Sequence, residues 1–261
     1  MSIIISCASI KGGCSKTTTA INLAAAVAEK GYMTLIVDMD PQANASTALN
    51  INKTEFSTSD VLMPKSRGGK AEPIENVIYE TKHKNLHIVP SHMSLSAARL
   101  VMNDVIGRES VLRKELMKPF IQNKYDFIFI DTAPSVDILL VNALAASNYV
   151  IGCSSCEYLA LEGIELMLDT FNSVKESDIN RGIKLLGVVA TKNNTTTHAK
   201  EVLDTLKDRY PILGITKTST KVNEATRAGI PVVYNTKNNP VSDEYRKIAK
   251  KLIDQYEREM L

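Results

Sequence analysis

Two lysines flank a pair of glycines near the start of the chain, directly after an apolar run. Lys11 precedes Gly12 and Gly13, and Lys16 follows them. The run before them, residues 3–8, is rich in β-branched side chains and is typical of a buried strand. A strand that ends in a tight glycine turn aims backbone N–H groups, and the positive end of the next helix, at one point. This pattern predicts a binding site for an anionic group such as a phosphate.

The residues around the second lysine complete the predicted phosphate site. Lys16 adds a positive charge, and Thr17 offers a hydroxyl to the Mg²⁺ that accompanies a nucleoside triphosphate. The general P-loop pattern has glycines where this chain has Ile10 and Ser15. Because Ser15 carries a Cβ, we expect a crowded site or a strained backbone there. An ordinary glycine turn with incidental lysines is the alternative. The candidate nucleotide-binding residues of this loop are Lys11, Gly12, Gly13, Cys14, Ser15, Lys16, Thr17 and Thr18.

Two acidic residues follow apolar runs further along the chain. Asp40 comes shortly after residues 34–37, and Asp131 directly follows residues 127–130. The carboxyl ends of parallel strands open on the crevice where such sheets bind ligands. Asp131 there has the Walker B arrangement and, with Thr17, is a predicted ligand of Mg²⁺. A helix-capping or turn aspartate is the alternative for Asp131.

Apolar runs alternate with stretches of helical period, which is typical of a parallel sheet covered by helices on both faces. The predicted fold class is therefore α/β with a mostly parallel twisted sheet. We predict strands at residues 3–8, 33–37, 86–89, 127–130, 149–153 and 185–190, with a weaker one at 212–215. We predict helices at residues 16–30, 94–120, 136–146, 160–175, 196–210, 222–228 and 242–260. Residues 50–84 have the composition of a loop.

The length of 261 residues allows one large α/β domain or two small ones, and we favour a single domain over residues 1–261. The charge is uneven along the chain. Residues 1–174 carry 15 Lys and Arg against 18 Asp and Glu, whereas residues 175–261 carry 16 against 11. This basic C-terminal third points to a polyanion-binding face, and a solvated surface with surplus lysines is the alternative.

Several classes of protein are disfavoured. The sequence contains no apolar run of about 18 residues and begins with a strand rather than a signal peptide, so we expect a cytoplasmic protein. Cys153 and Cys156 form a single C-x-x-C pair and are interpreted as buried apolar residues, with a metal or redox site as the alternative. The histidines show no metal-ligand spacing and are expected on the surface or in loops. They are His83, His87, His92 and His198.

Residues 11–18 resemble the deviant Walker A motif of the ParA/MinD family of ATPases, in which a signature lysine, here Lys11, stands beside the glycine pair. Residues 38–42, Asp-Met-Asp-Pro-Gln, resemble the switch segment of ParA proteins. That resemblance implies that Asp40 orients or polarises the attacking water during ATP hydrolysis. It makes Lys11, Lys16 and Asp40 the candidate catalytic residues.

Later segments are similar to those of chromosomal and plasmid ParA (Soj-like) partition ATPases, namely residues 142–144, 156–163, 224–225 and 229–232. The resemblance covers nearly the whole chain, and it is to the short ParA proteins without an N-terminal winged helix. It implies a P-loop NTPase fold with ATP or ADP and Mg²⁺ as cofactors. It also implies an ATP-dependent homodimer, binding to non-specific DNA, and slow hydrolysis that a ParB-like centromere-binding partner stimulates. The expected location is at the nucleoid, with no membrane partner.

Two segments depart from the family pattern. The family's Ile-Pro-Arg-Asn, which borders the adenine, is replaced at residues 215–218, so that Lys217 and Thr218 are the candidates for that position. The family's Asp-x-Arg segment, with an arginine implicated in DNA binding, is replaced by residues 193–197. The charge for DNA binding must then come from other residues. The candidates are Lys192, Lys200, Lys217, Lys221 and Arg227.

The resemblance implies a switch in which two subunits close over two ATP molecules and Lys11 of each reaches the partner's phosphates. A MinD-type ATPase at a membrane surface is one alternative, and it needs an amphipathic C-terminal helix. Residues 245, 248, 252 and 256 form an apolar stripe there, although packing on the domain explains the stripe equally. A redox or metal carrier of the iron-protein type rests only on Cys153 and Cys156. A nucleotide-dependent binding module with negligible turnover is the third alternative.

Overall fold

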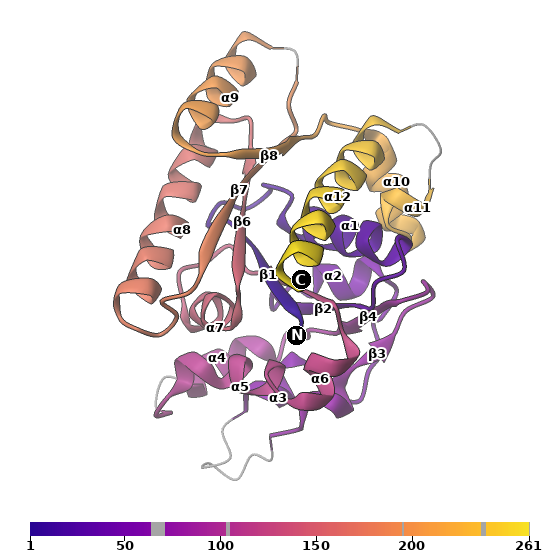
Figure 1. Cartoon of the computed structure of the whole chain (residues 1–261), viewed down its shortest axis with the longest axis vertical. Helices are drawn as coiled ribbons and strands as arrows, with labels where there is room; N and C mark the ends of the chain where they lie inside the picture. The colour runs from indigo at the N-terminus through magenta and orange to yellow at the C-terminus, as the bar shows by residue number, and fades with distance from the viewer. Residues whose placement is uncertain (64–70, 103–104, 195, 236–238, 261) are drawn as a thin grey trace.

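An eight-stranded sheet runs through the centre of the molecule (Figure 1). The computed structural model describes residues 1–63, 71–102, 105–194, 196–235 and 239–260. The strand order is β3-β4-β2-β5-β1-β6-β7-β8, and each neighbouring pair is parallel except β3 with β4. The strands are β1 (Ile3–Ala8), β2 (Thr34–Met39), β3 (Tyr79–Glu80), β4 (Leu86–Val89), β5 (Phe127–Thr132), β6 (Tyr149–Ser155), β7 (Lys184–Thr191) and β8 (Ile212–Ile215). The predicted fold class and all seven predicted strands are confirmed.

Helices cover both faces of the sheet because alternate residues of each strand point to opposite sides. Ile5 and Cys7 of β1 pack with α1 (Lys16–Glu29) and α12 (Pro240–Met260) on one face. On the other face, Ile4 packs with residues of α5 (Val111–Leu116) and α7 (Ile138–Ala146), and Ala8 packs with α8 (Tyr158–Glu176). In Figure 1, α8 and α9 (Thr197–Arg209) lie on one side of the sheet and α1 and α12 on the other.

The apolar stripe of α12 lies inside the protein. Tyr245, Ile248 and Leu252 are buried in the same core cluster as the side chains of α1. No described helix is long and apolar enough to cross a membrane. Packing in the core therefore explains the stripe.

The predicted helix over residues 94–120 is wrong. The described part of this stretch contains α4 (Leu95–Met102), a short 3₁₀ helix at Arg108–Ser110, α5, and the start of α6 (Pro119–Lys124). Gly107 has a left-handed φ of 71°, and Pro119 stands at the first position of α6. A left-handed residue interrupts a helix, and proline lacks the N–H that would continue one from the preceding turn. The helical period of the sequence therefore belongs to several short helices.

Residues 50–84 are only partly a loop, and residues 64–70 lie outside the described part. The segment contains α3 (Thr58–Leu62), a 3₁₀ helix at Ile74–Val77, and β3, none of which was predicted. The three remaining helices are α2 (Asn44–Ala48), α10 (Thr220–Ala228) and α11 (Val232–Asn235). Of these, α2 and α11 were not predicted either.

One histidine prediction is wrong, because His87 lies buried in β4 rather than on the surface. Its Nδ1 is 2.8 Å from the hydroxyl of Tyr125, and burial lowers the pKa of the ring. His83 and His92 are half-buried outside helices and strands, and His198 is exposed. Cys153 and Cys156 are buried, as predicted. Among the described residues, no group of three or more His, Cys, Asp and Glu side chains is arranged to hold a metal.

Candidate nucleotide-binding site

The loop between β1 and α1 turns through two residues with left-handed backbones. Gly13 has φ 79° and Ser15 has φ 61°. Glycine adopts this region freely, whereas a residue with a Cβ does so at a cost of about 1 kcal/mol. The strain predicted at Ser15 is therefore present, and the turn keeps its shape despite the serine. Ser15 is also the N-cap of α1 and makes no side-chain hydrogen bond to that helix.

A cavity of about 760 Å³ opens beside this loop, at the carboxyl ends of the parallel strands. This volume is within the usual range for sites that bind small molecules. The walls come from loop residues 12–18, from α2, from Pro134 after β5, and from the segments that follow β6, β7 and β8. The position agrees with the rule that open parallel sheets bind ligands beyond the carboxyl ends of their strands.

Lys16 is buried at the base of the loop, with 6% of its surface exposed. Its Nζ donates a hydrogen bond of 3.1 Å to the carbonyl oxygen of Lys11. A buried ammonium group needs an acceptor, and a loop carbonyl satisfies only part of that need. The site thus holds a positive charge that phosphate oxygens would satisfy more fully.

The carboxylate of Asp131 is fully buried close to Lys16 and Thr17. Neither of its oxygens has a hydrogen-bond partner among the described residues. Burial raises the pKa of Asp131 well above its usual value, and the nearby charges of Asp38 and Asp40 raise it further, whereas the Thr17 hydroxyl and Lys16 lower it. A bound cation compensates such a cluster of acids. The residues therefore fit Mg²⁺, with Asp131 and Thr17 as the groups that would hold it.

The two acids of the neighbouring strand have different environments. Asp38 lies opposite Asp131 in the sheet. Its carboxylate accepts hydrogen bonds from the Asp40 N–H (3.1 Å), the Ser46 N–H (2.9 Å) and the Ser46 hydroxyl (2.7 Å). Burial raises its pKa to about 6. Asp38 thus anchors the segment that begins with Asp40 and continues into α2, a role that sequence reasoning missed.

Asp40 occupies the first position beyond β2 and is also buried. One carboxylate oxygen accepts a hydrogen bond of 2.9 Å from the N–H of Gln42, and the backbone carbonyl accepts one from Ala43. The structure therefore places Asp131 close to Asp40, Lys16 and Thr17. Of these four residues, Lys16 and Thr17 line the cavity.

Gly163 of α8 lies directly against the start of the loop. Its carbonyl accepts a hydrogen bond of 3.2 Å from the N–H of Ile10. A Cβ at this position would lie 2.8 Å from the Cβ of Lys11 and 2.9 Å from its nitrogen. Only glycine fits without displacing Lys11, so Gly163 sets how closely α8 approaches the loop. The sequence showed a glycine in a helix but could not show what it contacts.

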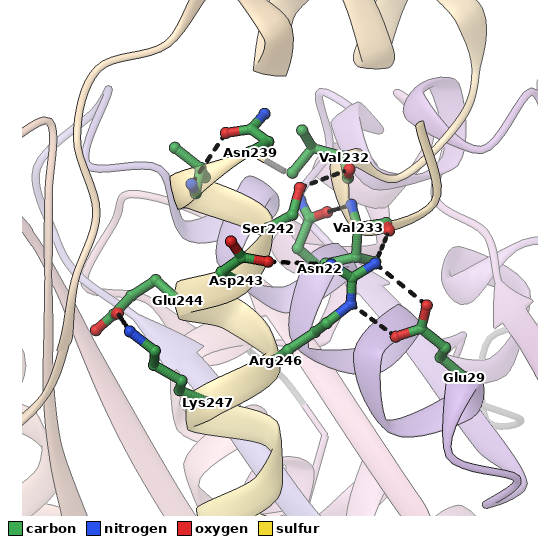
Figure 2. Close-up of polar contacts among 11 residues, drawn as sticks. Asn22, Glu29, Val232, Val233, Asn239, Ser242, Asp243, Glu244, Arg246 and Lys247 are labelled. Atoms are coloured by element: carbon green, nitrogen blue, oxygen red, sulfur yellow. Dashed lines mark hydrogen bonds and ion pairs between the residues drawn. The ribbon is translucent and has the colours of Figure 1, made fainter. Parts of the chain in front are cut away.

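The opposite wall of the cavity is fastened to α1 and α12 (Figure 2). The side-chain oxygen of Asn22 accepts a hydrogen bond of 3.2 Å from the Val233 N–H, and the Ser242 hydroxyl donates one of 2.8 Å to the Val232 carbonyl. Arg246 pairs with Glu29 at 2.8 Å and also donates to the Val233 carbonyl. These contacts fix the position of Val232, which lines the cavity, relative to α1.

The remaining predicted residues divide between two places. Lys192, Lys217 and Thr218 line the cavity. The other three are exposed on helices, with Lys200 on α9 and both Lys221 and Arg227 on α10. Lys221 forms an ion pair of 2.8 Å with Glu224. The structure thus places two of the predicted DNA-binding lysines beside the candidate nucleotide site.

Comparison with known proteins gives consistent matches over most of the chain. A family of AAA domains matches residues 2–185. The chromosome-partitioning ATPase Soj of Treponema pallidum is 36% identical over 247 residues, which cover 93% of this chain and 94% of the relative.

Two solved structures share the fold, each with a TM-score of 0.80 and 28% identity. A plasmid partition protein of Borrelia burgdorferi B31, bound to AMPPNP, covers 98% of this chain and is itself covered completely. The cobyrinic acid a,c-diamide synthase of Mycobacterium smegmatis, with bound ADP and magnesium, covers 98% of this chain, and 96% of its own length is matched.

Proposed function

This chain belongs to the ParA-like ATPases of the AAA-domain class, and on that premise we propose that it is an ATP-operated switch for DNA partition. ATP binding would bring two copies of the chain together and enable them to bind DNA without sequence preference. Hydrolysis, stimulated by a ParB-like partner, would separate them. The proposal treats residues 1–261 as a single ATPase domain that acts in the cytoplasm at the nucleoid.

The main support for nucleotide binding is the carboxylate of Asp131, which is buried beside Thr17 and Lys16 without a hydrogen-bond partner among the described residues. Backbone amides of the glycine turn and the Lys16 ammonium would bind the phosphates. Mg²⁺ held by Asp131 and Thr17 would neutralise charge on the phosphate oxygens. Asp40 would accept a hydrogen bond from the attacking water and so orient it toward the terminal phosphate.

The dimer part rests on an exposed apolar face of α8. Tyr158 is 64% exposed, Leu159 is 55% exposed and Leu166 is 49% exposed. Their spacing puts them on one side of the helix. Gly163 of the same helix contacts Lys11, so this apolar face lies close to the phosphate loop. A second copy that covers the face would carry its own loop toward this cavity, and Lys11 would reach the partner's phosphates.

The DNA part rests on exposed positive charges. Lys200, Lys221 and Arg227 are the candidates outside the cavity, and Lys217 lies at its wall. Each contact of this kind is weak and salt-dependent, but a dimer presents every contact twice. Joining two copies would therefore raise the affinity for DNA sharply. This account makes ATP the condition for DNA binding.

Three variants test the order of events. Lys16→Ala should abolish nucleotide binding, whereas Lys11→Ala should bind nucleotide but fail to dimerise. Asp40→Ala should bind ATP, dimerise and not hydrolyse. Light scattering with ATP or ADP measures the mass, and phosphate release measures turnover. Hydrolysis by Asp40→Ala at the parental rate would refute the role given to Asp40.

The same assays separate the rival functions. Phosphate release is measured alone, with DNA, and with a ParB-like partner. Cosedimentation with DNA or with anionic liposomes, each in the presence of ATP, distinguishes a partition ATPase from a MinD-type membrane ATPase. The buried stripe of α12 favours DNA. Turnover that stays at background under all conditions would instead indicate a nucleotide-dependent binding module.

A further inference from the structure

The cavity holds a lysine from outside the phosphate loop. We propose that Lys192 binds the phosphate chain of the nucleotide in its own subunit, as a second ammonium group in addition to that of Lys16. The proposal rests on the nucleotide-binding function proposed above. It assigns Lys192 to the nucleotide site, whereas the sequence made it a candidate for DNA binding.

The position of its side chain supports this assignment. Lys192 directly follows β7 and lines the cavity. Its Nζ is the atom nearest to the place where a Cβ on Gly13 would stand, at 3.9 Å. Gly13 belongs to the glycine turn whose amides form the predicted phosphate site. The ammonium group therefore lies at the turn itself and not on the outer surface of α9 or α10.

The backbone at Lys192 is held in a conformation that a lysine rarely adopts. Its φ is 54°, in the left-handed region. A residue with a Cβ stays there only when its surroundings impose it, and such residues concentrate at functional sites.

Both neighbours of Lys192 supply the constraint. The Thr191 hydroxyl donates a hydrogen bond of 3.3 Å to the carbonyl of Cys14 in the phosphate loop. The Asn193 N–H donates one of 2.9 Å to the carbonyl of Thr216, another residue of the cavity wall. The residues on either side of Lys192 are therefore hydrogen-bonded to the phosphate loop and to Thr216, which fixes the backbone at Lys192.

The burial and charge of the residues that line the cavity indicate how strongly Lys192 would contribute to phosphate binding. Both lysines line the cavity, but Lys16 is buried whereas Lys192 is exposed to solvent. Glu157 also lines the cavity, so the lining residues include both positive and negative side chains. A solvent-exposed ammonium attracts a phosphate chain with an energy that salt screens. We therefore expect a moderate contribution that grows with the number of phosphates.

The test compares Lys192→Gln with Lys184→Gln, a matched variant at the other end of the same strand, where the lysine is exposed and far along β7. Titration calorimetry of the full chain uses ATP and ADP with Mg²⁺, and adenosine. We expect Lys192→Gln to weaken ATP binding about 5- to 20-fold, which corresponds to about 1–2 kcal/mol. The loss should be smaller for ADP, absent for adenosine, and reduced by added salt.

Two further variants keep the outcome interpretable. Lys192→Arg retains the charge and should restore most of the ATP affinity. Lys16→Ala reports on the nucleotide site as a whole. If the parent protein binds no nucleotide, the proposed function fails. If Lys16→Ala abolishes binding but Lys192→Gln binds ATP as the parent does, only this inference is refuted. An equal loss for ATP and adenosine would also refute it, because the lysine would then act on cavity shape rather than on phosphate charge.

Discussion

Asp131 is expected to lower the stability of the folded protein. Its carboxylate is fully buried and has no hydrogen-bond partner among the described residues, which is unfavourable. Such a group persists where a ligand satisfies it. The same side chain is therefore expected to destabilise the protein without nucleotide and to stabilise its complex with Mg²⁺ and ATP.

The variant Asp131→Asn separates these two effects. Removing the charge relieves the repulsion from Asp38 and Asp40. We expect the nucleotide-free variant to be more stable than the parent, because a neutral amide costs less to bury beside Asp38 and Asp40 than a carboxylate does. Thermal unfolding with and without MgATP measures both states, and the stabilisation by MgATP should be lost. A variant that is less stable when free and still stabilised by MgATP would contradict this account.

The pKa of Asp38 gives a prediction about pH. Its folded value of about 6 lies above the ordinary value of about 4. The folded protein keeps this proton at pH values where the unfolded chain has lost it. The contribution of Asp38 to the free energy of unfolding should therefore fall by about 2–3 kcal/mol as the pH rises from about 4 through the folded pKa to about 7, and then stay constant.

Other groups titrate over the same range, so the measured quantity is the difference between the parent and Asp38→Asn. Urea unfolding of both proteins without Mg²⁺ and nucleotide, at several pH values between 4 and 8, gives this difference. The parent should lose stability relative to the variant as the pH rises to about 7. A stability difference that does not change with pH would show that burial does not raise the pKa of Asp38 in the folded protein.

The candidate site residues that lie close together in the structure share one property. Lys16, Thr17, Asp40 and Asp131 stand at fixed positions relative to a strand end, so local pattern alone placed them. Ser15 was predicted to be strained for the same reason, and its φ of 61° confirms it. Asp38, Gly163 and His87 depend on contacts across the sheet or between distant helices, which no local pattern contains.

At the level of elements, α8 connects the phosphate loop to the exposed apolar face. Gly163 makes the closest approach, and a side chain there would meet the backbone of Lys11 rather than the flexible end of a side chain. Any movement of α8 would therefore displace the start of the loop. This link explains why a glycine occurs in the interior of a 19-residue helix, where it is otherwise unfavourable.

The variant Gly163→Ala tests this connection. The added methyl group should push Lys11 away from α8 at a cost of about 1–3 kcal/mol. We expect ATP-dependent dimerisation to weaken at least about tenfold while nucleotide affinity, which depends on Lys16, changes less than about threefold. Analytical ultracentrifugation and calorimetry measure these quantities.

Gly182→Ala is the matched control, because its Cβ would have its nearest neighbour at 3.9 Å, an ordinary contact distance. It should dimerise like the parent. Dimerisation of Gly163→Ala at the parental affinity would show that the contact with Lys11 has no role in assembly.

Some family-like segments turn out to serve packing. Asn142 is fully buried in α7. Its side-chain oxygen accepts a hydrogen bond of 3.1 Å from the Leu112 N–H, and its amide donates to the carbonyls of Arg108 and Ile138. It therefore fastens α5 to α7. The sequence showed the resemblance of residues 142–144 to a partition ATPase but not that this residue joins two helices.

The elements that the sequence missed are short or depend on distant partners. The two-residue β3 pairs only with β4 at the edge of the sheet, and α2 is set by the hydrogen bonds that Asp38 makes to Ser46. For residues 94–120 the error was to predict one long helix where the structure has several short ones. The apolar residues keep a helical spacing across Gly107 and Pro119, although the backbone breaks at both positions. The long parallel strands were predictable because they are mostly buried and each contains a run of consecutive apolar residues.

Over the whole molecule, charge and apolar surface are arranged around one end of the sheet. Lys16 of the loop and Lys192 line the cavity, and Asp131, with Asp38 and Asp40 nearby, lies next to Lys16. The helix α8, which carries the exposed apolar side chains, contacts the start of the loop through Gly163. Three of the candidate DNA-binding residues lie on α9 and α10. A ligand at this single site would therefore influence both proposed contacts, with a second copy and with DNA.

Titration of the full chain with ATP in the presence of Mg²⁺ tests the central claim most directly. We predict saturable heat with one nucleotide bound per chain, a weaker response without Mg²⁺, and no response from Lys16→Ala. The absence of heat with both ATP and ADP at millimolar concentrations, from a protein that unfolds cooperatively and is therefore folded, would contradict the account.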